Sequence, residues 1–394
     1  YFEKTAYVNF DNNARMKQVF EGDLDIERLV LAISAETGVS IEAENTLIIF
    51  DEIQEVPKAL TSLKYFHENA PQYAIVAAGS LLGVALHQGT SFPVGKVDFL
   101  DLYPLNFREF LCAMGEKQFV SMLDSCDTQM VTVFKTKYIE RLREYYFVGG
   151  MPEVVKDFSE KKDYNRVRAI QKNLINYYQQ DFSKHAEIKL VPRLNLVWNS
   201  IPMQLAKENK KYIYGQVRKG SRAKDFELAI QWLLDCGLIH KVQRIQKPDL
   251  PLKAYIDFDA FKLFLVDIGL LIAMTDLDAK VIIEGNKIFT EFNGSLTEQY
   301  ILQQLISDVG VIPYYYSTQN SKGEIDFLVQ GKTSVIPIEV KAEENLKAKS
   351  LKAFCEKYQP SYAVRTSMSD YREQDWMTNI PLYAIKWIEN YVNQ

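Results

Sequence analysis

The chain has 394 residues, a length that predicts two or three domains rather than one. Hydrophobic residues make up 47% of it and charged residues 25%, which excludes a disordered chain, a collagen-like chain and a small disulfide-bonded scaffold. The net charge of −5 argues against a protein coated with nucleic acid, although a local basic patch is compatible with it.

The four cysteines are scattered and form no CxxC pair, so we expect reduced thiols rather than disulfides or a zinc site. No apolar run approaches the roughly 18 residues that a membrane-spanning helix needs, and no signal peptide is visible. These features predict a cytoplasmic protein without a membrane partner.

Strand and helix patterns alternate over residues 1–110. Strands are predicted at residues 6–10, 46–50, 73–78 and 97–102, and helices at 23–36 and 57–67. The two middle strands are continuously apolar, as is typical of strands buried on both faces of a parallel sheet. The alternating order predicts a parallel α/β sheet.

The rest of the chain divides into a helical part and a second α/β part. Helical patterns continue from residue 107, and Gly149-Gly150-Met151-Pro152 marks the first expected boundary. Residues 191–245 predict short helices and then a strand pair, an order that resembles a winged helix. Beyond a second boundary near residues 275–286, the pattern predicts helices at 295–306 and 348–358 and strands at 313–316, 324–329, 335–340 and 362–365.

A candidate Walker B element lies in Leu47-Ile48-Ile49-Phe50-Asp51-Glu52, where two acids follow four apolar residues. At the carboxyl end of a parallel strand, Asp51 would hold Mg²⁺ through water. Glu52 would orient and polarise the water that attacks a phosphate. The alternative is a buried strand that simply emerges into solvent at two acids.

The next apolar strand also ends in a polar residue, Ser80. In this topology Ser80 would lie near Asp51 and sense the γ-phosphate of ATP, as a polar residue there does in NTPases of the AAA type. The alternative is that Ser80 caps the helix that follows. The two elements in this order favour an ATPase that uses ATP and Mg²⁺.

A phosphate-binding loop of the form GxxxxGK[ST] does not occur in the chain. Gly95-Lys96 lacks both the upstream glycine and the Ser or Thr that follows. Because a Walker B strand acts together with such a loop, we expect a strand, a phosphate loop and a helix, roughly 30 residues, before Tyr1.

Several segments resemble a large prokaryotic family of AAA-type ATPases that carry a C-terminal domain of unknown function. They are LIIFDEIQEVP (47–57), AGSLL (78–82), FPVGKVDFLDLYPLNFREF (92–110), YFVGGMPEV (146–154) and residues 323–341. The resemblance covers essentially the whole chain and implies an ATP site preceded by a Walker A loop. It also implies a cofactor-binding role near the phosphates for Lys96, where the family tends to have arginine.

The C-terminal part contains two acidic strand segments, Glu324-Ile325-Asp326 and Glu339-Val340-Lys341. With Glu298 on the preceding helix, they resemble the core of a restriction-endonuclease-like nuclease. Asp326, Glu339 and Glu298 would then hold a divalent metal, and Lys341 would assist the attacking water. The alternative is a structural relic in which Lys341 balances Asp326 and no cleavage occurs.

A basic stretch lies in the middle part, with two tyrosines interleaved. Its members are Lys207, Lys210, Lys211, Tyr212, Tyr214, Arg218, Lys219, Arg222 and Lys224. Such a stretch beside a helix would contact DNA phosphates. The alternative is an ordinary solvated surface.

Together these patterns predict an α/β chain of three domains. They are a P-loop NTPase-like ATPase domain without its Walker A segment (1–148), a helical and winged-helix-like domain (149–280) and a nuclease-like α/β domain (281–394). The expected function is ATP hydrolysis coupled to a DNA or protein client. The alternatives are a DNA-binding or metal-dependent DNA-cleaving protein with a regulatory nucleotide domain, and a binding protein whose nucleotide site is inactive.

Overall fold

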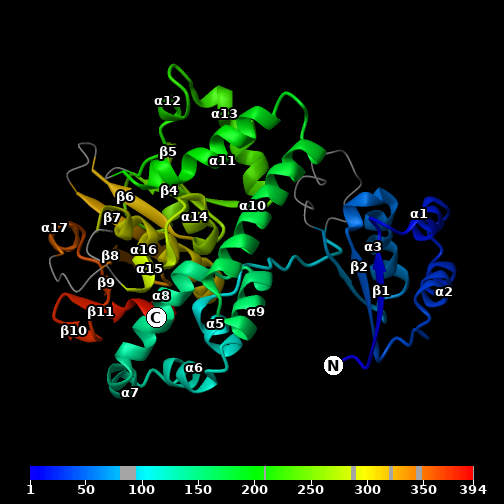
Figure 1. The fold of residues 1–394 in the computed structure, drawn as a ribbon, viewed down its shortest axis with the longest axis horizontal. Helices are drawn as coiled ribbons and strands as arrows, with labels where there is room; N and C mark the ends of the chain where they lie inside the picture. The colour runs from blue at the N-terminus through cyan, green and yellow to red at the C-terminus, as the bar shows by residue number, and fades with distance from the viewer. Residues whose placement is uncertain (80–94, 208–209, 285–289, 319–322, 343–347, 394) are drawn as a thin grey trace. The chain divides into compact units, whose positions relative to one another are not determined.

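The structure is a computed structural model that describes residues 1–79, 95–207, 210–284, 290–318, 323–342 and 348–393. The chain forms two compact units, Tyr1–Leu102 with Gln231–Gly237 and Tyr103–Ile230 with Leu238–Gln394. Both units contain helices and strands (Figure 1), as expected for a mixed α/β protein. The predicted boundary at residue 148 differs from this division, because the helices that follow Leu102 belong to the larger unit.

The smaller unit contains a parallel sheet of three strands in the order β1-β2-β3. Its strands are β1 (Lys4–Asn9), β2 (Thr46–Asp51) and β3 (Ala74–Ala77). The connecting helices are α1 (Ala14–Glu21), α2 (Ile26–Thr37), the short η1 (Ile53–Glu55) and α3 (Pro57–Asn69). The prediction of a parallel sheet at this end of the chain is confirmed.

Only one face of this sheet is fully covered by the described residues. Four side chains on that face are buried in a core shared with α1, α2 and α3: Ala6, Val8, Ile48 and Phe50. On the other face, Tyr7 is 51% exposed and Val76 is 50% exposed. Within the described part of the chain, the apolar strands β2 and β3 are therefore not buried on both faces of the sheet.

The strand predicted at residues 97–102 is not formed. The backbone of this segment is irregular, and three of its apolar side chains are exposed, namely Phe99, Leu100 and Leu102. A strand requires a neighbour that takes up its backbone hydrogen bonds, and an apolar pattern alone does not supply one.

The larger unit begins with a run of helices. They are α5 (Phe107–Ala113), α6 (Lys117–Asp124), α7 (Thr128–Val133), α8 (Lys135–Val148), α9 (Pro152–Lys161), α10 (Tyr164–His185), α11 (Val191–Leu205), α12 (Tyr214–Val217) and α13 (Ala223–Asp235), whose last residues belong to the smaller unit. The short η2 (Leu252–Tyr255) lies between the strands of the first pair, which is followed by α14 (Ile268–Met274), α15 (Ala279–Ile283), α16 (Thr290–Gln304) and η4 (Leu305–Val309). The chain ends with α17 (Lys349–Tyr358), η5 (Leu382–Ile388) and α18 (Glu389–Val392).

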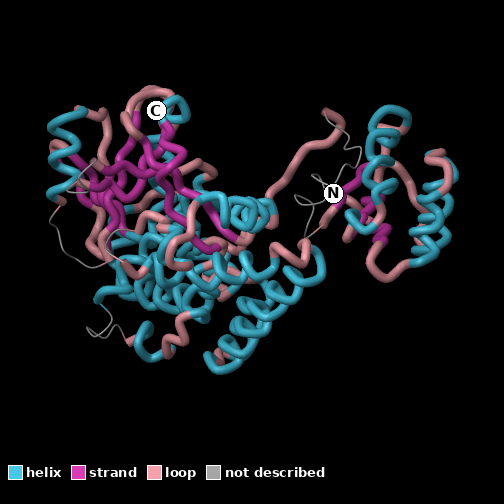
Figure 2. Tube along the Cα trace, turned by 90° about the horizontal axis from the view of Figure 1, so that it is seen from above, coloured by secondary structure: helices cyan, strands magenta, loops and turns pink. Residues whose placement is uncertain are grey.

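A mixed sheet of eight strands forms the centre of this unit, in the order β10-β11-β9-β8-β7-β6-β4-β5. Its strands are β4 (Ile239–Ile245), β5 (Ile256–Leu265), β6 (Tyr314–Ser317), β7 (Glu324–Gln330), β8 (Val335–Val340), β9 (Val364–Ser367), β10 (Arg372–Gln374) and β11 (Met377–Pro381). Most helices of the unit lie to one side of this sheet (Figure 2).

Residues 191–245, for which helices and a strand pair are predicted, contain α11, α12, α13 and β4, whereas β5, the antiparallel partner of β4, lies beyond this range. However, β4 also pairs in parallel with β6, which comes after the predicted boundary at residue 280. The two parts that the sequence suggests as separate domains therefore share one continuous sheet.

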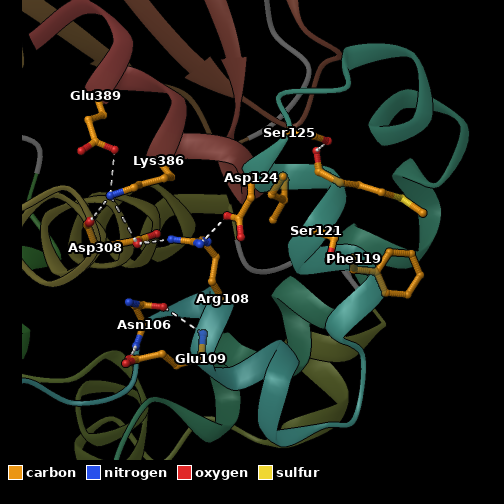
Figure 3. Close-up of polar contacts among 12 residues, drawn as sticks. Asn106, Arg108, Glu109, Phe119, Ser121, Asp124, Ser125, Asp308, Lys386 and Glu389 are labelled. Carbon is orange, nitrogen blue, oxygen red and sulfur yellow. Dashed lines mark hydrogen bonds and ion pairs between the residues drawn. The ribbon is translucent and has the colours of Figure 1, made fainter. Parts of the chain in front are cut away.

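The start of α5 forms a hydrogen bond and an ion pair with residues in the C-terminal half of the chain. Asn106 caps the helix and exchanges hydrogen bonds with Glu109, and the Phe107 backbone N–H donates to Gln304 Oε1 at 2.8 Å. Arg108 lies between Asp124 and Asp308, with 2.9 Å to the latter (Figure 3). Residues 103–110, the last part of the segment 92–110 that resembles the ATPase family, thus contribute packing and ion pairs within the larger unit.

Gly149 and Gly150 are needed because other backbone and side-chain atoms approach them closely. The Gly150 N–H donates to the buried Asp267 at 2.6 Å, and the Gly150 carbonyl accepts from the Leu105 N–H at 2.8 Å. A Cβ on Gly150 would lie 2.1 Å from the Leu105 carbonyl oxygen, a distance that no packing tolerates. The position at which the sequence predicts a domain boundary is therefore one where two segments of backbone are in close contact.

We expect Gly150→Ala to destabilise the larger unit by about 1–3 kcal/mol, because backbone atoms must move apart to admit the methyl group. Urea unfolding followed by circular dichroism measures the change. Gly215→Ala is the matched control, since no atom lies within 4 Å of a Cβ at that position. Equal stability of the two variants would contradict this account of the glycine pair.

Candidate functional site

The strand ends of the small parallel sheet place several polar side chains at one edge. Asp51 is the last residue of β2, and the parallel register puts it beside Asn9, the last residue of β1. Glu52 follows directly. The Ala78 N–H donates to the Phe50 carbonyl at 2.7 Å, so the segment after β3 continues beside the same edge.

The Asp51 carboxylate has three hydrogen-bond donors. Its Oδ2 atom accepts from the Tyr7 hydroxyl and from Asn9 Nδ2, the latter at 3.2 Å. Its Oδ1 atom accepts from the Glu52 backbone N–H at 3.0 Å. The hydrogen bond to the carboxylate raises the pKa of the Tyr7 phenol, which therefore stays protonated and donates.

Glu52 adopts a backbone conformation that non-glycine residues rarely use. Its φ of 51° and ψ of 43° lie in the left-handed region, which costs a residue of this kind roughly 1 kcal/mol or more. Its carboxylate accepts a hydrogen bond from Gln54 Nε2. Strain of this kind persists where the surrounding structure holds it, and it is common at functional sites.

The two other predicted nucleotide-site residues are not brought to Asp51 by any described contact. Lys96 forms an ion pair of 3.4 Å with Glu68 of α3. Ser80 lies outside the described residues, so its predicted role as a γ-phosphate sensor stays a prediction.

A second charged cluster lies at the large sheet, around the fully buried Lys262 of β5. Lys262 Nζ lies 2.5 Å from Glu324 Oε1 and 3.6 Å from Glu298 Oε2, and 4.8 Å above the ring of Tyr315. Lys210 forms a second ion pair with Glu298. Burial alone would lower the pKa of Lys262, but the neighbouring carboxylates outweigh it and raise this pKa above its ordinary value.

The pKa values of two acids of this cluster, Asp326 and Glu298, are shifted in opposite directions. Burial and the negative charge of Glu298 raise the pKa of Asp326 to about 7. Burial also acts to raise the pKa of Glu298, but the charges of Lys210 and Lys262 lower it below its ordinary value. Lys210 and Lys262 therefore balance part of the negative charge of this cluster, and the raised pKa of Asp326 favours its protonated form.

The predicted metal ligands have other partners. Strands β7 and β8 pair antiparallel, and Asp326 Oδ2 accepts a hydrogen bond from the Val340 N–H at 2.7 Å. Glu339 accepts from the Leu351 N–H in the first turn of α17 at 3.1 Å, and Lys341 lies 2.7 Å from Glu339 rather than bridging Asp326. Within the described residues, no group of three acids, histidines or cysteines is placed to hold a metal ion.

The basic stretch of the middle part divides into buried and exposed members. Lys210 belongs to the buried cluster, and Tyr212 stacks on Phe261 at 5.5 Å within the core. These side chains are therefore not available to DNA. The exposed cations are Arg218, Lys219, Arg222 and Lys224.

Four contributors to these two clusters escape sequence reasoning: Tyr7, Asn9, Gln54 and Lys262. Tyr7 and Asn9 alternate on a strand expected beside the Walker B strand, which is a usable signal once the register is known. Lys262 is a lone cation within the apolar run Ala260-Phe261-Lys262-Leu263, a pattern that indicates a buried partner.

The comparisons with known proteins give three matches along the chain. Residues 1–111 match an AAA domain, residues 139–281 a domain of unknown function (DUF8612) and residues 293–385 another domain of unknown function (DUF4143). No curated protein and no solved structure matches the chain. The first match supports the predicted AAA-type ATPase family and a nucleotide-binding function, and the parallel sheet is consistent with the P-loop fold of such a domain.

Among the described residues, no helix is both long enough and apolar enough to cross a bilayer.

The buried acid cluster predicts a pH dependence of stability. Because the pKa of Asp326 lies near 7 in the folded chain and its ordinary value is 3.8, the folded chain keeps a proton that the unfolded chain loses. This contribution is complete below about pH 4 and is lost as the pH rises through about 7. Asp326→Asn imitates the protonated acid, so its melting temperature should exceed that of the parent increasingly from pH 5 to pH 8.

Thermal unfolding in a series of buffers measures this difference. Asp249→Asn is the control, because Asp249 is an exposed acid that pairs only with Lys247 and the neighbouring Leu250 N–H. A difference in melting temperature between Asp326→Asn and the parent that stays constant across this pH range would show that folding does not raise the pKa of Asp326.

Proposed function

We propose that the protein is an AAA-type ATPase whose hydrolytic residues are Asp51 and Glu52. The observation that carries the proposal is the position of this acid pair at the carboxyl edge of a central parallel strand, within the segment that matches an AAA domain. Open α/β sheets bind ligands at that edge. ATP hydrolysis would be coupled to work on a client, which is DNA or a protein.

The chemistry of the donor set fits a hydrated Mg²⁺ ion. Carboxylate oxygens are the hard ligands that Mg²⁺ prefers, and Asp51 supplies them at the end of β2, with the Glu52 carboxylate next in the chain. When bound, Mg²⁺ would neutralise charge that develops on the transferred phosphoryl group. Asp51 would orient a water of the hydrated ion, and Glu52 would orient and polarise the attacking water.

Two further residues belong to this proposal. Ser80 would sense the γ-phosphate from the end of the neighbouring strand. Lys96 would approach the phosphates after leaving Glu68, and this exchange is easy because both side chains of the pair are about one-third exposed.

We expect Glu52→Gln to keep ATP binding and to lower turnover roughly 100-fold or more, because the amide cannot polarise water as a carboxylate does. Steady-state ATP hydrolysis and equilibrium binding of a fluorescent ATP analogue, with the full-length protein, measure the two quantities. Glu55→Gln is the matched control, since Glu55 lies in η1 and pairs loosely with Lys17 at 3.9 Å. Equal turnover in Glu52→Gln and the parent would exclude Glu52 from catalysis.

DNA as the client is supported by the four exposed cations between α12 and the first turn of α13, Arg218, Lys219, Arg222 and Lys224. Replacing all four by Ser should weaken binding to duplex DNA and flatten its salt dependence, by about 0.9 in the logarithmic slope for each lost phosphate contact. Fluorescence anisotropy at several salt concentrations measures both effects.

A control variant loses the same charge from exposed lysines elsewhere: Lys156, Lys172, Lys352 and Lys357. If the two quadruple variants bind DNA with the same affinity and the same slope, the cations near α13 are ordinary solvated surface and the client is a protein.

A further inference from the structure

Tyr7 occupies an unusual position for a large aromatic side chain. It is 51% exposed, on the incompletely covered face of the small sheet, so burial of its ring is not what fixes its place. Its hydroxyl instead donates to Asp51 Oδ2 on the neighbouring strand. The register pairs Tyr7 with Ile49, so the phenol reaches forward along the sheet to the end of β2.

The donors to Asp51 among the described residues are shared unequally between its two carboxylate oxygens. Each carboxylate oxygen can accept about two hydrogen bonds. Oδ2 accepts from Tyr7 and from Asn9 Nδ2, and Asn9 Nδ2 also lies 3.4 Å from the Tyr7 hydroxyl. Oδ1 accepts from the Glu52 N–H. With respect to the described part of the chain, Oδ1 thus has one donor and can accept a second hydrogen bond, and donors on both oxygens fix the rotation of the carboxylate.

We propose that Tyr7 is a positioning residue for the nucleotide-bound metal: it fixes the rotation of Asp51 so that Oδ1 can accept a metal-bound water. This inference rests on the proposed ATPase function. Tyr7 acts through Asp51 and touches neither the nucleotide nor the metal. Asn9 also helps to fix the rotation of the Asp51 carboxylate. Its own Oδ1 accepts a hydrogen bond from the Asp11 N–H at 2.8 Å, which holds the Asn9 amide in place as a donor.

Tyr7→Phe tests this role because it removes the hydroxyl and keeps the ring. Loss of one hydrogen bond that orders a charged group corresponds to about a fivefold effect. We expect the Mn²⁺ concentration that half-saturates the full-length protein, in the presence of a non-hydrolysable ATP analogue, to rise about fivefold. Binding of the analogue without metal and the melting temperature should stay unchanged. Electron paramagnetic resonance of free Mn²⁺ provides the measurement.

Two further variants separate positioning from a general structural effect. Tyr65→Phe removes a hydroxyl from α3 in the same unit and should leave the Mn²⁺ requirement as it is. In the Asp51→Asn background, Tyr7→Phe should add nothing to the loss that Asp51→Asn causes, because Tyr7 then has no carboxylate to orient.

The results distinguish the role of Tyr7 from the ATPase function on which it rests. A raised Mn²⁺ requirement in Tyr7→Phe alone supports the inference. An unchanged requirement, with normal binding of metal and analogue by the parent, overturns the role of Tyr7 and leaves the ATPase proposal standing. A parent that binds neither the analogue nor Mn²⁺ overturns the ATPase proposal and, with it, the role of Tyr7.

Discussion

The parallel pairing of β1 with β2 is the constraint on which the candidate site depends. Because both strands run in the same direction, their last residues, Asn9 and Asp51, lie side by side, and the alternation of β1 brings Tyr7 to the same carboxylate. A shift of one residue in register would turn these side chains to the opposite face. The buried face of the sheet, formed by residues such as Val8 and Phe50, fixes that register through its core contacts.

The larger unit depends on a different constraint, the cost of burying charge. A carboxylate or an ammonium group leaves water only when it is paired, and removing one partner of a buried pair typically costs about 3–5 kcal/mol. Lys262 of β5 and Lys210 provide the pairs for Glu298 and Glu324, so the segment that precedes the large sheet is tied to α16 and β7. Glu298, one of the acids that resemble a nuclease centre in the sequence, is thus balanced by lysines from distant parts of the chain.

Local patterns are enough to predict the parts of the fold that depend on neighbours in sequence. The parallel sheet and the acid pair at Asp51 follow from apolar runs and from what ends them. Residues 97–102 have a strand pattern but form no strand, and the pairing of β4 with β6 joins segments about 70 residues apart, so neither could be read from the pattern. The partners of Glu298 are likewise set by tertiary contacts, which a motif does not encode.

The central claim is that the edge of the small sheet at Asp51 and Glu52 binds and hydrolyses a metal-bound nucleotide. The most direct measurement is anomalous scattering from crystals of the full-length protein grown with Mn²⁺ and a non-hydrolysable ATP analogue. The account predicts one strong manganese peak at the Asp51 edge, with the terminal phosphate beside Glu52. A peak among Asp326, Glu339 and Glu298, with none at Asp51, would contradict it.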